Sequence, residues 1–130
     1  MPSSPAIINL ILAWALIVFG FGGGFIFGLF FHQDHWMGGY TSFRRRLYRL
    51  AHIASMALAM INILFYLTVQ RLPYPNRAID IASWGFMIGA ISMPIACLIM
   101  AHYVKARAIF LIPVISLISA AVITLLEVVN

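Results

Sequence analysis

The chain has 130 residues, of which 64% are hydrophobic and only 8% are charged, and its mean hydropathy is +1.03. A soluble domain usually carries charge on about a quarter of its residues, so this composition excludes a soluble globular protein. The formal net charge is +5, but the cations stand at the ends of apolar runs and leave no soluble surface for nucleic acid. We therefore predict an integral membrane protein with no nucleic-acid partner.

Four apolar runs, each close to the roughly 20 residues that a helix needs to cross a bilayer, take up most of the chain. The strands of a membrane barrel alternate and measure about ten residues, which these uninterrupted runs do not. Backbone amides in lipid must find partners within their own segment. We predict an all-α integral membrane domain over residues 1–130, an up-down-up-down bundle of four transmembrane helices over residues 7–31, 50–69, 79–104 and 108–129.

The first predicted span carries a glycine at every fourth position, at Gly20, Gly24 and Gly28. Small residues mark the packed face of a membrane helix, because they let two backbones approach closely. This spacing favours a helix-packing stripe. An alternative interpretation is that the glycines clear space for a flat cofactor, such as a porphyrin, against the backbone.

The connection over residues 32–43 is the longest between two spans. The pair Gly38-Gly39 predicts a turn within it. Thr41 or Ser42 stands where a cap is expected for a helix that begins with arginines and continues into the second span.

Asn62 is the strongly polar side chain inside the second span. A neighbouring helix is the partner that such a side chain finds in lipid, so we predict an interhelical hydrogen bond for Asn62. No acidic residue stands deep in any span, because Asp80 and Glu127 lie near span ends. A proton-coupled exporter normally needs a carboxylate in mid-membrane, so that function class is disfavoured.

The basic residues divide unequally between the two sides of the predicted bundle. One side has Arg71 and Arg77. The other side has Arg44, Arg45, Arg46, Arg49, Lys105 and Arg107. The positive-inside rule then places both termini outside, in a bacterial inner membrane, with the larger basic group in the cytoplasm beside anionic lipid headgroups.

All four histidines fall on that same basic side, at His32, His35, His52 and His102. Imidazole ligates haem iron and many transition metals. His52 and His102 stand at similar depth on neighbouring spans, so we predict that they bind a b-type haem. His32 and His35 offer an alternative metal site, completed by His52, His102 or Asp34. Two further interpretations remain open: interfacial histidines that bind no cofactor, and a pH-sensitive cluster.

The sequence offers no catalytic residue set, such as a nucleophile elbow, a phosphate loop or paired catalytic carboxylates. We predict a small subunit of a larger membrane assembly, of the respiratory or electron-transfer type, whose partners are other membrane subunits and lipid. A purely structural subunit and a minimal oligomeric channel or transporter are the alternatives.

Overall fold

The computed structural model describes residues 4–73 and 76–129, and these residues form four long helices and two short 3-10 helices with no strand among them. The bounds of these elements are α1 Ser4–Phe30, η1 Trp36–Gly38, α2 Phe43–Val69, α3 Arg77–His102, η2 Val104–Phe110 and α4 Leu111–Val129. Each long helix coincides with or overlaps a segment that is long and apolar enough to cross a membrane. The predicted all-α membrane architecture with four helices is confirmed.

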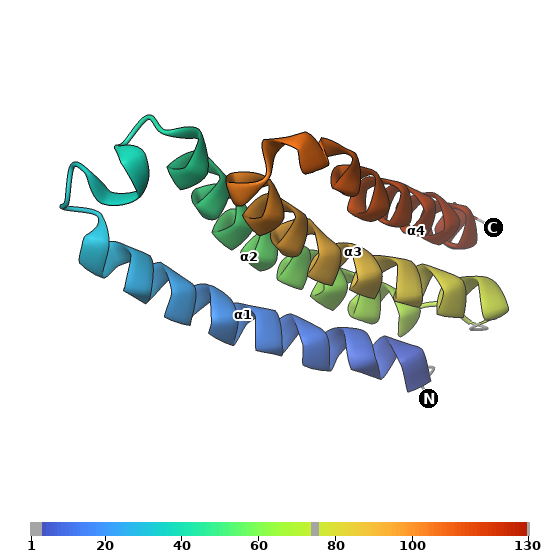
Figure 1. Cartoon of the computed structure of the whole chain (residues 1–130). Coiled ribbons are helices and arrows are strands. Elements are labelled where there is room, and N and C mark those ends of the chain that lie inside the picture. Colours follow the sequence, from blue (N-terminus) through green and yellow to red (C-terminus); the bar gives the residue numbers. More distant parts are fainter. Residues whose placement is uncertain (1–3, 74–75, 130) are drawn as a thin grey trace.

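The four helices alternate in direction and lie side by side (Figure 1). α2 and α3 form the central pair, α1 packs mainly on α2, and α4 packs on α3. Within the described residues α1 also contacts α3, but it has no extensive contact with α4. The bundle is therefore open on the side between α1 and α4. The end with the two termini and the α2–α3 connection is the termini end, and the opposite end is the arginine end.

The helix boundaries differ from the predicted spans most clearly in α2 and α4. α2 begins at Phe43, not at residue 50, because Ser42 caps it: its hydroxyl accepts a hydrogen bond from the Arg45 N–H at 3.2 Å and donates one to the Met37 carbonyl at 2.7 Å. Residues 108–110 belong to η2, so that α4 begins at Leu111. Hydropathy predicts the apolar part of a helix that crosses the membrane, whereas the capping residue decides where the helix begins. The Ser42 cap therefore extends α2 beyond its apolar part. In the second connection, Tyr74 and Pro75 lie outside the described residues.

The apolar core lies toward the termini end, where all four helices contribute to it. Its buried residues are Ala6, Phe65, Val69, Ile79, Ala82, Phe86 and Ala120. Beside this core three fully buried polar residues join α1, α2 and α3: Asn9, Asn62 and Ser83. The Asn9 amide donates to Asn62 Oδ1 at 2.7 Å and to the Ser83 carbonyl at 3.2 Å, and the Ser83 hydroxyl donates to Asn9 Oδ1. Asn62 thus has the interhelical bond expected of it.

The α3–α4 seam is tight because glycine on α3 lets α4 approach. A Cβ atom added at Gly85 would lie 2.8 Å from Ala120 Cβ and 3.1 Å from the Ser116 carbonyl oxygen. The Ser116 hydroxyl donates to the Gly85 carbonyl at 2.6 Å. At Gly89 an added Cβ would lie 2.4 Å from Leu117 side-chain carbons. These contacts hold the middle of α4, from Ser116 to Ala120, against α3.

Candidate functional site around His52

Arg45 organises the arginine end of the bundle. Its side chain is 1% exposed, and its Nη2 donates to the Phe31 carbonyl at 2.9 Å. The guanidinium carbon lies 4.9 Å from the ring centres of Phe31 and Tyr40 and 5.5 Å from that of Trp36. Ring faces attract a cation strongly where water is excluded. In the sequence Arg45 indicated only the orientation of the bundle, whereas in the structure it anchors the connection between α1 and α2.

The turn predicted at Gly38-Gly39 is present. Gly38 has φ of 84° and Gly39 has φ of 97°, values that glycine adopts without strain, and Met37 before them has φ of 56°. Together with η1, this turn brings Trp36 and Tyr40 back over the ends of α1 and α2, where they contact Arg45.

His32 and His35 lie in this connection, and both are exposed. Neither is part of a regular helix, and His35 precedes η1 without capping it by its side chain. Across residues 4–73 and 76–129, no group of three or more His, Cys, Asp or Glu side chains is placed to hold a metal ion. A metal site at His32 and His35 therefore stays a prediction that needs ligands from outside this chain.

His102 ends α3 and is exposed, and one of its nitrogens is engaged. The Tyr48 hydroxyl lies 2.9 Å from His102 Nε2, and the two rings meet edge to face with centres 6.0 Å apart. Ligation of a metal through Nε2 would require Tyr48 to release it. The other nitrogen, Nδ1, is the remaining ligand atom.

His52 is half-buried in the part of α2 that faces α1. Its ring meets Phe27 edge to face with centres 6.2 Å apart, and a Cβ added at Gly24 would lie 3.0 Å from His52 Cε1. Within the described residues, its ring nitrogens make no hydrogen bond to another group. His52 therefore differs from the exposed His32 and His35 by its half-buried place between helices, and from His102 by having no hydrogen bond to Tyr48.

Two cavities flank His52, and both also reach Phe27. One, of about 180 Å³, lies among α1, α2 and α3, and its walls include Gly23, Ser55 and Pro94. The other, of about 190 Å³, lies between α1 and α2 and includes Arg49. Pockets that enclose a small-molecule ligand usually measure about 300–1,000 Å³, so each cavity is smaller than an enclosed ligand site.

The glycines of α1 differ in their surroundings. A Cβ added at Gly20 would lie 2.0 Å from Met56 Sδ and one at Gly24 would press on His52, but nothing lies within 4 Å of such an atom at Gly28. In an α-helix, four residues rotate about 40° more than one full turn. Glycines at every fourth position of α1 therefore turn gradually away from the face that contacts α2. The predicted packing stripe therefore does not extend to Gly28.

The structure thus directs His52 toward α1 and bonds His102 to Tyr48, while His32 and His35 lie in the connection. Tyr48 links these surroundings, because its ring also meets that of Phe27 edge to face at 6.0 Å. Sequence reasoning did not single out Tyr48 or Phe27. Compared with known protein families, curated proteins and solved structures, the chain shows no significant match to any of them.

Proposed function

We propose that this chain is a small membrane subunit of an electron-transfer assembly, and that His52 binds a redox group at the α1–α2 seam. The redox group is a b-type haem or a transition metal, and a neighbouring subunit completes its site. The observation that carries the proposal is the half-buried His52 imidazole without an internal hydrogen bond. Neutral imidazole is the commonest metal-binding side chain and an axial haem ligand.

The surroundings of His52 support a flat or compact ligand. Gly24 exposes backbone beside the ring, and Gly23 and Gly28 leave open space on α1. Arg49 lines the cavity on one side of His52, where a cation suits a haem propionate. Because neither cavity encloses a haem, the proposal requires a second polypeptide against α1 or a ligand that also contacts lipid.

Pairing of His52 with His102 on one haem is a more demanding version of the proposal. It requires Tyr48 to give up His102 Nε2, or His102 to ligate through Nδ1. In the first case the edge-to-face contact between the Tyr48 and His102 rings would be lost, and in the second case Tyr48 would keep its bond to Nε2. A site to which this chain would contribute His52 alone, with the partner subunit supplying the other ligand, would need no such change.

A visible spectrum of the protein purified with its membrane partners tests the proposal. We expect a haem or metal absorption that disappears in His52→Ala and persists in His32→Ala, because His32 is exposed in the connection. A flat spectrum together with a metal-free elemental analysis contradicts the proposal. That result favours the second candidate, a structural subunit, for which the fully bonded Asn9, Asn62 and Ser83 contact is the supporting observation.

The orientation with both termini outside belongs to the same proposal. The excess of basic residues at the arginine end supports this orientation. Arg44 and Arg46 are exposed there, and Lys105 follows α3. Single cysteines at Gly39 and Val129, in a Cys97→Ser background, report the two sides. We expect a membrane-impermeant reagent added outside to label position 129 and spare position 39, and the reverse pattern contradicts the orientation.

A further inference from the structure

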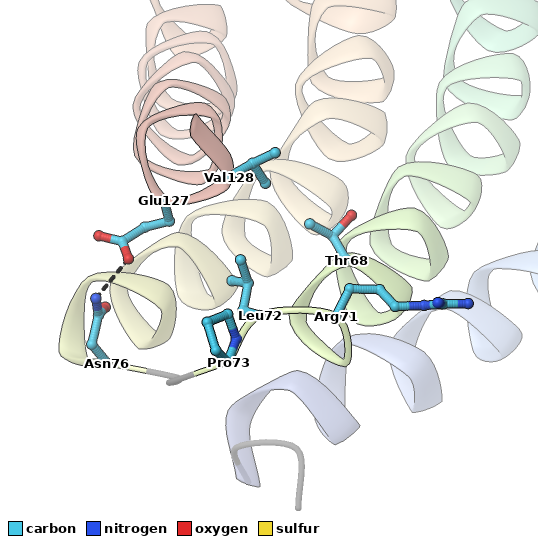
Figure 2. A pocket seen from close by; sticks show the side chains of 7 residues that line it. All are labelled: Thr68, Arg71, Leu72, Pro73, Asn76, Glu127 and Val128. Atoms are coloured by element: carbon cyan, nitrogen blue, oxygen red, sulfur yellow. Dashed lines mark hydrogen bonds between the residues drawn. The ribbon is translucent and has the colours of Figure 1, made fainter. Parts of the chain in front are cut away.

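The end of α4 is joined to the start of α3 by a hydrogen bond to a charged side chain. Glu127 Oε2 accepts this bond from the Asn76 amide at 2.6 Å (Figure 2). Among the described residues, no other side-chain hydrogen bond joins α4 beyond Ala120 to another element, because the Thr124 hydroxyl donates to the Ala120 carbonyl of α4 itself. The bond between Asn76 and Glu127 is therefore the polar attachment of this part of α4.

Asn76 uses both ends of its side-chain amide. Its Oδ1 caps α3 by accepting from the N–H groups of Ala78 at 2.9 Å and Ile79 at 3.2 Å, while its Nδ2 donates to Glu127. The Glu127 carboxylate therefore lies beside the N-terminus of α3. A negative charge is stabilised near a helix N-terminus and disfavoured near a C-terminus. Because Glu127 stands in the last turn of α4, its charge is favoured by α3 and not by its own helix.

Three other charged side chains stand at the termini end. Arg71 lines the same cavity as Glu127, of about 610 Å³, but its side chain points away from Glu127 (Figure 2). Arg77 and Asp80 belong to the first turn of α3. Asn130 lies outside the described residues, and all four histidines belong to the arginine end. Asp80 and Glu127 are therefore the side chains at this end that take up a proton between pH 7 and about pH 3.5.

We propose that the Asn76–Glu127 bond is an acid-sensitive latch that holds the end of α4 against the start of α3. A proton from the medium binds the Glu127 carboxylate and removes its charge. A hydrogen bond to an ionised group is roughly twice as strong as one between neutral groups, so the bond weakens, and the favourable charge beside α3 is lost. Glu127 and Val128 line the cavity from α4, so release of the latch widens the cavity. The latch is independent of the proposed redox function.

Distances between two spin labels test the latch in the whole chain, reconstituted in nanodiscs. The labels are attached to single cysteines at Gln70 and Val129, which are both exposed, in a Cys97→Ser background. The first position reports the end of α2 and the second reports the end of α4. We expect a narrow distribution of distances at pH 7 and a broader distribution at about pH 3.5, where carboxylates are protonated.

Three variants assign the response to Glu127. Glu127→Gln keeps only a neutral bond to Asn76, so its distribution should be broad at both pH values. Asn76→Ser keeps a capping hydroxyl for α3 but lacks the amide that reaches Glu127, so it should also be broad at both. Asp80→Asn is the matched control. It removes the other carboxylate side chain at this end, and it should respond to acid as the unaltered chain does.

Circular dichroism of each variant shows whether the helices are intact. A distribution that is equally narrow at both pH values in the unaltered chain overturns the proposal. A Glu127→Gln variant that still broadens in acid also overturns it, because the response then belongs to another group. If Glu127→Gln stays narrow at both pH values, the charge of Glu127 does not hold α4, and the proposal fails in the same way.

Discussion

The α1–α2 and α3–α4 seams both contain glycine, yet they are built differently. Along α3–α4, backbone and small side chains meet directly, as at Gly85 and Ala120. Along α1–α2, larger and more mobile groups fill the space, namely Met56 opposite Gly20 and His52 opposite Gly24, and cavities remain beside His52. The α1–α2 seam therefore keeps open space beside His52, whereas at Gly85 and Gly89 the α3–α4 seam is closed.

α1 has side-chain hydrogen bonds to the rest of the bundle near its two ends. At the termini end Asn9 bonds to α2 and α3, and at the arginine end the Phe31 carbonyl after α1 accepts from Arg45. A helix that is fixed at its ends can leave a gap in its middle without separating from the bundle. The cavities beside His52 lie between these two points of attachment.

The largest expected effect is on the tight seam. Gly85→Leu forces α3 and α4 apart, because a Cβ there would already lie 3.1 Å from the Ser116 carbonyl oxygen, and overpacking of this kind costs about 3 kcal/mol. Gly22→Leu is the control, since nothing lies within 4 Å of a Cβ at Gly22. Reversible unfolding in mixed micelles measures both. Equal stability of the two variants would show that the seams do not differ as described.

The second effect concerns the polar contact that holds α1. Asn9→Leu leaves Asn62 and Ser83 without their partner, and a buried polar group left unpaired costs about 2 kcal/mol. Removing Asn62 as well, in the double variant Asn9→Leu/Asn62→Leu, should recover part of this loss. The same unfolding measurement applies, and a double variant that is less stable than the sum of the single losses contradicts the account.

A smaller effect of opposite sign is expected at Gly28. Gly28→Ala meets open space and gains helix propensity, so it stabilises the protein by about 0.5 kcal/mol. Gly24→Ala has the same gain, but its Cβ meets His52 at 3.0 Å. The melting temperature should therefore rise in Gly28→Ala, and that of Gly24→Ala should be lower than that of Gly28→Ala. A greater rise for Gly24→Ala would place His52 away from α1.

The smallest expected effect on stability is at His52. His52→Leu keeps the contact with Phe27 and removes no internal hydrogen bond, so the free energy of unfolding should change by less than about 0.5 kcal/mol. Loss of ligand in this variant, with stability retained, separates a binding role from a packing role. A loss of stability as large as that of Asn9→Leu would make His52 a structural residue.

Much of the fold follows from the sequence, because long apolar runs have few alternatives in a membrane. The turn at Gly38-Gly39 and the cap at Ser42 were also predictable, since each depends on local chemistry. The Asn9 bond to Asn62 and the ring contacts of Arg45 were not, because they join segments that are distant in sequence. The direction of the His52 ring was equally out of reach. Hydropathy predicts how deep a residue lies in the membrane, but it does not predict which neighbouring helix the side chain faces.

The enclosure of Arg45 has a consequence for conditions under which the protein keeps its shape. Among the described residues, the partners of this guanidinium are backbone carbonyl oxygens and aromatic ring faces, and none of them is a carboxylate. A buried contact of this kind is also screened little by dissolved salt. The link between the first two helices should therefore stay closed in acidified or concentrated media, where a carboxylate partner would have let it open.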